Sequence, residues 1–255
     1  MRLIIFLVSI VFLLTPAFAK SSVEFVHITD VNLTPNSANE VYRTIKEINS
    51  YPNVDFVVFG GNNIAKPNYD NLDVFCQLLR KVNKKTIVLL GSSDVFSGGG
   101  LNKKYYMWQV KLARNLRHNI KTNYVFKKNG IVFVVMDGSK QFFASQNGYY
   151  SPKELMFLDK TLSKYKNYPV VILQHFPILP NSSRWLETAK YEDYNEIISK
   201  HNNVKAIISG HYGKNSEQKI NNVTNIITES YTHGNAYKII QMDFKDDYIG
   251  TYLVK

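Results

Sequence analysis

Cysteine is almost absent from this 255-residue chain, and its scarcity excludes stabilisation by internal disulfides. Cys76 is the only cysteine, so no pair can form and the folded state must depend on a buried core. Cys76 lies in an apolar stripe of helical spacing between Leu72 and Val82, which favours a buried side chain over a reactive thiol.

Long apolar runs are equally scarce, and the one run present lies at the start of the chain. Arg2 is followed by apolar residues from Leu3 to Leu14 and then by the tripeptide Ala17-Phe18-Ala19. This order is typical of an export signal, and a run of about 12 residues is short for a bilayer span, which needs about 20. We therefore expect residues 1–19 to be a signal peptide and the mature chain to be periplasmic or extracellular after cleavage near Ala19, with an uncleaved membrane anchor as the alternative. No cysteine lies directly after the run to carry a lipid, and residues 20–255 contain no second run of spanning length.

Acidic residues are too few to balance the basic ones. The chain has 31 lysines and arginines against 20 aspartates and glutamates, a formal net charge of +11. Such an excess favours anionic partners. The lysines occur in scattered pairs such as Lys84-Lys85, with no long basic run and no nucleic-acid-binding motif, which favours a solvated basic surface. The partners that we expect are an anionic small molecule or a component of the cell envelope.

Apolar strands alternate with amphipathic helices along residues 20–255. The patterns Ser37-x-x-Glu40 and Ser151-Pro152-Lys153-Glu154 predict two helix starts. The alternation indicates a largely parallel sheet with helical crossovers and a second sheet packed on it, and no repeat or linker divides the chain. We therefore expect one α/β domain over residues 20–255. The predicted helices cover residues 37–49, 69–82, 105–118, 152–165 and 192–200; the predicted strands cover residues 23–29, 54–59, 86–90, 124–126, 131–136, 170–173 and 204–208, with further short strands between 218 and 254.

Five of these strands end in a short polar or glycine turn. In an α/β sheet the loops at the carboxyl ends of the strands gather at one edge, so turns that are far apart in the sequence can converge. The order and placement of the five turns resemble the calcineurin-like metallophosphoesterases, whose usual motifs are D-x-H, G-D, G-N-H-D/E, H and G-H-x-H. The turns are Ile28-Thr29-Asp30-Val31-Asn32, Phe59-Gly60-Gly61-Asn62-Asn63, Leu90-Gly91-Ser92-Ser93-Asp94, Gln174-His175-Phe176-Pro177 and Ser209-Gly210-His211-Tyr212-Gly213.

The resemblance covers essentially the whole mature chain and implies both a fold and a chemistry. The family fold consists of two β-sheets sandwiched between helical layers. Its enzymes hold two cations about 3.5–4 Å apart, which clamp the phosphoryl oxygens and activate a bridging water as the nucleophile. A phosphoester hydrolase is therefore the activity that the resemblance implies, provided that the metal ligands are present.

Compared motif by motif, this chain keeps only part of that ligand set. The resemblance implies that Asp30, His175 and His211 are the metal ligands that remain. The other ligand positions are degenerate: Asn32 and Gly213 replace histidines, Ser92 replaces the asparagine, and Gly61 replaces the bridging aspartate.

The third motif also lacks the histidine that takes part in catalysis in the family. Ser93 stands where the family has the histidine that assists the leaving group, so no catalytic residue is assigned. Asp94 keeps the final acidic letter of that motif. We expect Asp94 and Asn63 to support the site from behind the ligands.

Gly61 is the most damaging replacement, because a glycine cannot bridge two cations. Asp30 would be the only anionic ligand, so two divalent ions would leave about three positive charges uncompensated in a buried site. We therefore expect either no cofactor or one divalent transition metal (Zn, Mn or Fe), since imidazole suits such ions; a dinuclear site is not expected. The alternative for Asp30 is a structural role in which its carboxylate accepts hydrogen bonds from loop amides.

Three functional hypotheses follow from the sequence. The first is an exported pseudoenzyme with impaired or lost two-metal hydrolysis, which binds an anionic ligand or partner in the former active-site crevice. The second is an active metal-dependent phosphoesterase that uses a reduced, one-metal site. The third is a structural or interaction protein of the cell envelope.

Overall fold

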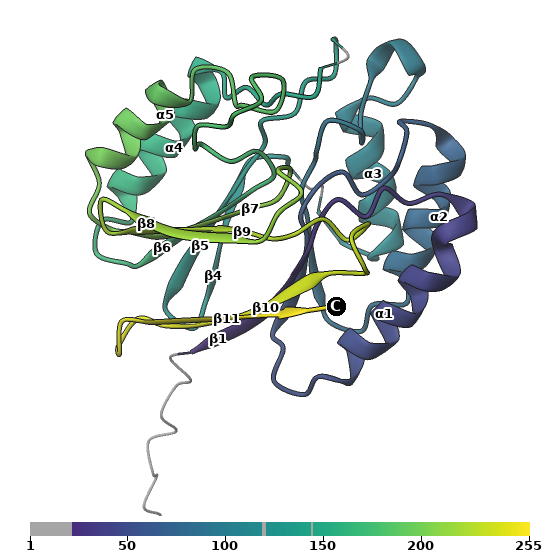
Figure 1. Cartoon of the computed structure of the whole chain (residues 1–255), viewed down its shortest axis with the longest axis horizontal. Helices are drawn as coiled ribbons and strands as arrows, with labels where there is room; N and C mark the ends of the chain where they lie inside the picture. The colour runs from purple at the N-terminus through teal and green to yellow at the C-terminus, as the bar shows by residue number, and fades with distance from the viewer. Residues whose placement is uncertain (1–21, 119–120, 144) are drawn as a thin grey trace, which may run out of the picture.

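The computed structural model describes residues 22–118, 121–143 and 145–255 (Figure 1). The predicted signal peptide, residues 1–19, lies outside the described residues, and its cleavage remains a prediction. Within the described ranges, every helix is too short or too polar to cross a membrane.

Two sheets form the centre of the molecule. In the first sheet, three parallel strands are extended by an antiparallel pair on the side of β1. In the second, four parallel strands are bordered by an antiparallel strand at each edge. The first sheet has the order β11 (Tyr248–Val254), β10 (Tyr237–Asp243), β1 (Val23–Ile28), β2 (Phe56–Phe59) and β3 (Lys85–Val88); the second has the order β4 (Tyr124–Lys128), β5 (Ile131–Met136), β6 (Val170–Gln174), β7 (Val204–Ser209), β9 (Val223–Ile227) and β8 (Ser216–Ile220).

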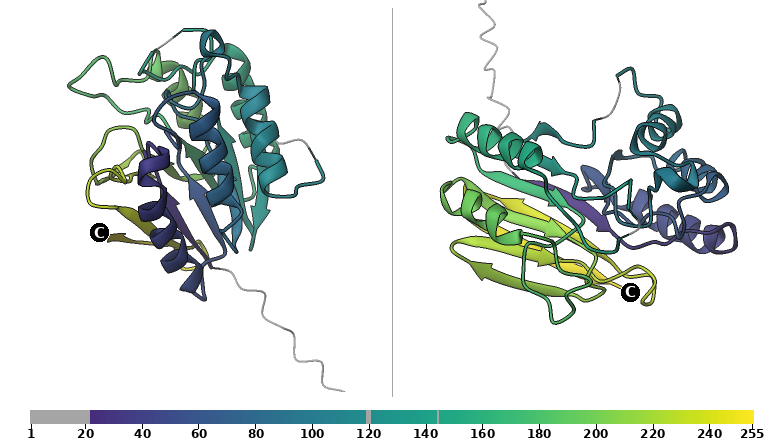
Figure 2. Two further views of the ribbon diagram at one scale, coloured as in Figure 1. Left: turned by 90° about the vertical axis from the view of Figure 1, so that its right-hand side faces the viewer. Right: turned by 90° about the horizontal axis from the view of Figure 1, so that it is seen from above.

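Helices cover the outer face of each sheet, as the two views of Figure 2 show. The first sheet is covered by α1 (Ala38–Ser50), α2 (Tyr69–Leu79) and α3 (Lys103–Ala113). The second is covered by α4 (Pro152–Lys164) and α5 (Tyr191–Ser199). The predicted fold class, two β-sheets between helical layers, is confirmed.

The core between the two sheets is built mainly from aromatic and branched side chains. Phe25 stacks on Phe56 with ring centroids 4.9 Å apart, and Phe133 of the opposite sheet meets both rings edge-on. Successive residues of a strand point to opposite faces, so the central strands bury side chains both between the sheets and under the helices. This explains why they appear in the sequence as nearly continuous apolar runs.

Both predicted helix starts are right, but only one of them forms the predicted capping box. Ser37 and Glu40 do not form a capping box; instead, Thr34 and Ser37 form one around the short 3₁₀ turn Pro35–Ser37, and α1 follows at Ala38. At α4 the predicted box is present, because the backbone N–H of Ser151 donates to Glu154 at 2.8 Å.

The helix predicted over residues 105–118 also ends earlier than expected. Asn115 adopts a left-handed conformation with φ 49°, which is a common way to end a helix. The neighbouring Arg114 turns its guanidinium to the carbonyls at the end of α2, including that of Val82 at 2.8 Å. Helix α3 therefore stops at Ala113.

Candidate metal site

The five turns predicted to converge do lie at one end of the two sheets. The backbone N–H of Asp30, after β1, donates to the carbonyl of Gly61, after β2, at 2.9 Å. Across the second sheet, the N–H of Gly210 donates to the carbonyl of His175 at 3.1 Å. The two sheets meet here through Tyr231, whose N–H donates to the carbonyl of Thr29 at 2.9 Å. The carboxyl ends of β1, β2, β6 and β7 thus share one neighbourhood, as the α/β topology requires.

The three predicted residual ligands form one group, which we call the Asp–His–His cluster: Asp30, His175 and His211. One potential ligand atom of each lies within 4.8 Å of the others. His175 Nε2 is 3.9 Å from Asp30 Oδ1, and the two imidazole rings have centroids 5.0 Å apart. The side chains are buried, with relative exposures of 5%, 1% and 8% for the whole residues. The sequence therefore identified three side chains that the fold brings together, although it did not predict how fully they are covered.

Both histidines of the cluster are held with one ring nitrogen free. His175 Nδ1 lies 2.7 Å from the carbonyl oxygen of Gly60, and His211 Nε2 lies 3.2 Å from that of Leu186. A carbonyl accepts, so these nitrogens carry the hydrogens, and His175 Nε2 and His211 Nδ1 carry lone pairs. Neither lone pair has a hydrogen-bond partner among the described residues. This arrangement, in which one ring N–H is held by a carbonyl, is typical of metal-binding imidazoles.

The electrostatics of the cluster favour neutral imidazoles. Burial lowers the pKa of His175 to about 4, although the hydrogen bond to Gly60 opposes the shift. Burial, followed by the proximity of His175, lowers the pKa of His211 to about 3. Neutral imidazole is the form that binds a metal.

The carboxylate of Asp30 already accepts hydrogen bonds on both oxygens. Asn62 Nδ2 donates to Oδ1 at 2.9 Å. Thr29 Oγ1 and the backbone N–H of His211 donate to Oδ2 at 3.0 and 2.9 Å. Burial raises the pKa of Asp30, whereas these donors favour its charged form. The structural role considered for Asp30 is therefore present in the fold, and a metal would have to share the carboxylate with it.

The donor set fits one transition-metal ion after a small adjustment. Two ligand atoms bound at about 2.1 Å to a common ion can be at most about 4.2 Å apart, whereas the cluster spreads to 4.8 Å. Two imidazoles and a carboxylate suit Zn, Mn or Fe, so a modest closure of the side chains would complete the set. Over the described part of the chain, no other group of three His, Cys, Asp or Glu residues is spaced to hold an ion.

The bridging position is sterically blocked in addition to lacking a carboxylate. Gly61 has φ 94°, and a Cβ there would lie 2.7 Å from Cγ and Nδ1 of His175 and 2.9 Å from the nitrogen of Gly91. Contacts this short require a neighbour to move, and here the neighbours are a buried ring and backbone. A side chain at position 61, where the family has its bridging aspartate, would therefore collide with His175 and Gly91.

In the third turn, both serine side chains are hydrogen-bonded to the turn after β2. Ser93 Oγ donates to the carbonyl of Ile64 at 2.6 Å, and its backbone N–H donates to Asn62 Oδ1 at 2.9 Å. Ser92 Oγ also approaches Asn62 Oδ1, at 3.3 Å. Ser93, at the leaving-group position, is therefore part of the loop framework.

The two residues expected to support the site lie behind it. Asp94 is fully buried and accepts from the backbone N–H groups of Gly91, Asn63 and Ile64 at 2.7–3.1 Å. Asn63 Nδ2 donates to the carbonyl of Leu89 at 2.8 Å and to Asp94 Oδ2 at 3.2 Å. Together they join the turns after β2 and β3; they do not touch the Asp–His–His cluster in any contact recorded for the described residues.

The remaining degenerate positions supply no ligand. Asn32 has φ 46°, and its amide donates to the carbonyl of Asp30 at 3.2 Å. Gly213 has φ 65°, and the nearest atom to a Cβ there is Cε1 of His233, at 3.4 Å. His233 is exposed, and its Nδ1 is 3.0 Å from the carbonyl oxygen of Gly213. His233 thus lies beside the lost histidine position without restoring the ligand.

Sequence reasoning missed the part played by Asn62. A neutral amide is a poor substitute for a bridging carboxylate, yet this one links the carboxylate of Asp30 to the turn after β3. The available signal was its place after Gly61 at a strand end, because asparagine tolerates the left-handed conformation that it adopts here, with φ 50°. His27 is buried in β1 below the site, with Nδ1 2.7 Å from Thr228 Oγ1.

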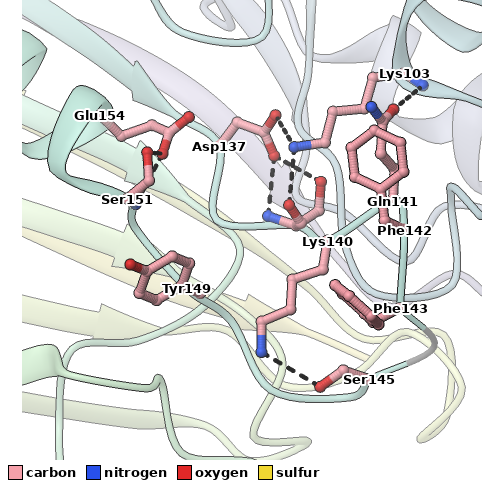
Figure 3. A pocket seen from close by; sticks show the side chains of 11 residues that line it. Lys103, Asp137, Lys140, Gln141, Phe142, Phe143, Ser145, Tyr149, Ser151 and Glu154 are labelled. Atoms are coloured by element: carbon pink, nitrogen blue, oxygen red, sulfur yellow. Dashed lines mark hydrogen bonds and ion pairs between the residues drawn. The ribbon is translucent and has the colours of Figure 1, made fainter.

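A cavity of about 520 Å³ lies between the loop after β5 and the start of α3 (Figure 3). Lys103 Nζ donates to Asp137 Oδ2 and to the carbonyl of Ser139, both at 2.8 Å. Phe142 and Phe143 on the same loop are 71% and 76% exposed. The ion pair fixes the loop against α3, and the cavity contains none of the predicted site residues.

Comparison with known proteins agrees with this geometry. The chain finds no match among curated protein sequences. A dimetal phosphatase from Danio rerio has the same fold, with a TM-score of 0.67 and 14% identity over 91% of this chain and 98% of that one. The protein TT1561 of Thermus thermophilus superposes with a TM-score of 0.61 and 12% identity, covering 91% of this chain and 99% of that one.

A third solved structure extends the comparison. GAP50, the anchor in the inner membrane complex of Plasmodium, superposes with a TM-score of 0.60 and 14% identity over 92% of this chain and 85% of that one. At such identities the three likenesses establish the fold alone. The calcineurin-like phosphoesterase family model matches residues 23–214, a range that contains all five turns. By its sequence pattern and its fold, the chain belongs to the calcineurin-like phosphoesterase family.

Proposed function

We propose that this chain is an exported member of the family in which two-metal hydrolysis is impaired or lost, and that it binds an anionic ligand or partner in the former active-site crevice. The main observation in support of the proposal is the position of the Asn62 side chain. Its amide nitrogen lies 2.9 Å from Asp30 Oδ1, on the carboxylate that a metal would use. The protein itself thus supplies a hydrogen-bond donor at the oxygen that a metal would otherwise bind. Export rests on the sequence pattern of residues 1–19.

The charge of the site argues against two metals. Asp30 is the only carboxylate of the cluster, so two divalent ions would leave about three positive charges without a partner in a buried place. Gly61 cannot contribute a bridge, because His175 fills the space that its Cβ would need. The loss of a histidine at Ser93 removes leaving-group assistance, which is typically worth about 10²–10⁴-fold in rate.

One divalent transition metal is compatible with the residues present. His175 Nε2, His211 Nδ1 and an oxygen of Asp30 would hold it, and the net charge of the loaded cluster would be about +1. When bound, such an ion supplies Lewis-acid attraction for an anionic oxygen. The protein's part is to keep both imidazoles in the metal-binding tautomer through the carbonyls of Gly60 and Leu186. A phosphate ester is the anion that we propose, by analogy with the family.

A second candidate function is a phosphoesterase that works with this single metal. The two free imidazole lone pairs favour it, because buried polar atoms without partners are rare in structural sites. Against it, the cluster is covered and no acid or base is placed beside it among the described residues. The one-metal hydrolase requires both a bound metal and turnover, whereas the impaired member requires neither.

Metal analysis combined with an assay of phosphomonoesters and phosphodiesters tests the proposal. We expect at most one Zn, Mn or Fe per purified chain and little turnover when these metals are supplied. His175→Ala and His211→Ala should lose the metal, while the exposed-histidine variant His118→Ala should keep it. Efficient turnover that both cluster variants abolish would refute the impaired-enzyme proposal and establish the one-metal hydrolase. Two metals per chain would contradict both.

A further inference from the structure

The end of the molecule opposite the Asp–His–His cluster forms one continuous face. Asn129 Nδ2, in the turn before β5, donates to the carbonyl of Ser22, before β1, at 2.8 Å. Backbone hydrogen bonds continue this connection from Val132 to Pro169 and from Val170 to Asn203, at 3.0 and 2.8 Å. We call it the amino-end face, because it gathers the turns that precede the parallel strands.

The β10–β11 hairpin completes this face. Antiparallel pairing aligns Met242 of β10 with Val23 of β1, so the turn after β10 lies beside the start of β1. Figure 1 shows both at the foot of the view, where the chain enters its first strand.

A cavity of about 500 Å³ opens on the amino-end face. Three lysines line it, Lys166, Lys200 and Lys205, and no aspartate or glutamate does. Lys166 and Lys205 form no ion pair with any described carboxylate. Lys200 pairs with Glu196 at 2.8 Å, but both side chains are more than half exposed, so the pair contributes little. His201, which also lines the cavity, pairs with the half-exposed Asp159 at 2.7 Å. The three lysines still leave the cavity with an excess of positive charge.

Aromatic rings accompany the lysines along this face. Lys127 Nζ lies 3.8 Å from the ring centroid of Tyr168, which also lines the cavity and is 41% exposed. Phe244 of the β10–β11 hairpin lines the same cavity. Exposed Asp246 and Asp247 on that hairpin offset part of the charge at one edge. Lysines next to partly exposed aromatic rings are the combination that proteins place at a membrane–water interface.

The apolar run near the start of the chain is a second argument for a position beside a membrane. Residues 1–21 precede Ser22 at this face, and the apolar run of the sequence ends at Leu14. The seven residues from 15 to 21 can span at most about 25 Å when fully extended. If that run stays in a bilayer as an uncleaved anchor, it would hold the amino-end face close to the lipid headgroups.

We propose that the amino-end face binds a membrane surface carrying anionic phosphate headgroups, with the cavity between Lys166, Lys200 and Lys205 receiving a headgroup phosphate. The opposite end, with the Asp–His–His cluster, then faces away from the lipid. The proposal is independent of what that cluster binds. A nucleic acid is the other polyanion to consider, and a single compact cavity beside partly exposed aromatic rings favours a headgroup over a long phosphate backbone.

Vesicle co-sedimentation of residues 20–255 tests the proposal without the apolar run. We expect binding to phosphatidylcholine vesicles that contain phosphatidylserine, and none to phosphatidylcholine alone. Changing Lys166, Lys200 and Lys205 together to glutamine should weaken the affinity about 100-fold, at about fivefold for each lysine near the surface. The matched control changes Lys66, Lys104 and Lys214 to glutamine. These exposed lysines lie after β2, at the start of α3 and after β7, at the cluster's end of the molecule.

The control variant carries the same change in net charge but should bind nearly as the unchanged protein does, because its lysines lie beyond the roughly 10 Å range of screened electrostatics from the lipid. Equal losses in the two variants would attribute binding to overall charge and overturn the proposal, as would the absence of binding to anionic vesicles. Displacement by millimolar inorganic phosphate would assign the cavity to free phosphate instead. Tighter binding to a DNA duplex than to vesicles at physiological salt would assign the face to nucleic acid. Circular dichroism of both variants checks that they remain folded.

Discussion

Replacing Gly61 by alanine tests whether the bridging position is sterically closed. The new Cβ would lie 2.7 Å from Cγ and Nδ1 of His175 and 2.9 Å from the nitrogen of Gly91. The ring of His175 would have to move, and with it the 2.7 Å hydrogen bond from Nδ1 to the carbonyl of Gly60. Alanine would also have to adopt φ 94°, which L-residues rarely do.

These two costs can be estimated separately. The left-handed backbone costs an alanine roughly 1–2 kcal/mol relative to glycine. Loss of a buried hydrogen bond adds about 1–3 kcal/mol, so Gly61→Ala should reduce the free energy of unfolding by about 2–5 kcal/mol. Gly130 provides the matched control, because it has φ 81° and nothing within 4 Å of the added Cβ. Gly130→Ala should cost only the backbone part, roughly 1–2 kcal/mol.

Urea unfolding and thermal melting of the two variants measure this difference. A difference of about 1–3 kcal/mol corresponds to a melting temperature lower by between about 2 and 12 °C for Gly61→Ala than for Gly130→Ala in a domain of this size. Equal destabilisation of the two variants would refute the reasoning, because it would mean that His175 leaves room for a side chain. In that case Gly61→Asp alone could rebuild the bridge. We expect instead that Gly61→Asp remains unable to bind a second metal.

Three further outcomes are expected. Asp94→Asn should destabilise the fold by about 2–4 kcal/mol in urea unfolding, because an amide NH₂ would face the backbone donors that the carboxylate now accepts; an unchanged midpoint would contradict this. Burial lowers the pKa values of His27, His175 and His211 to about 3–4 from 6.5, so the unfolded chain binds more protons than the native one between about pH 6.5 and 4. Unfolding free energy should therefore fall with decreasing pH by up to about 1.4 kcal/mol per pH unit for each histidine, and His27→Gln should flatten the slope whereas exposed His118→Gln should not. The intact mass of protein from its native host should match a chain starting at Lys20, and full-length protein in the membrane fraction would support the anchor instead.

The alternation of strands and helices was predictable from the sequence, because the spacing of apolar residues in each element shows which of its faces are buried. The central strands are apolar throughout because the fold buries both of their faces. The helix at Ser151 begins where its local capping signal places it. At Ser37 the helix also begins where predicted, but Ser37 forms its capping box with Thr34 around the preceding 3₁₀ turn instead of with Glu40. Local patterns identify elements well and their boundaries less well, since neighbouring signals compete for one terminus.

The membership of the candidate site was also determined by the sequence. Asp30, His175 and His211 come from strand ends that the α/β topology must bring together, so their convergence needed no knowledge of side-chain packing. Comparison with the family motifs likewise showed that Gly61 replaces the bridging aspartate and that Ser93 replaces the histidine that assists the leaving group.

Only the tertiary structure decided what the remaining groups do. That Asn62 donates to Asp30, that the ring of His175 fills the bridging position, and that Leu186 covers His211 all depend on contacts between segments distant in the sequence. The lysines of the amino-end face come from separate turns and gather only because the parallel strands all begin at one end. Sequence periodicity records whether a side chain is buried, whereas the partner that it meets is set by the packing of the whole chain.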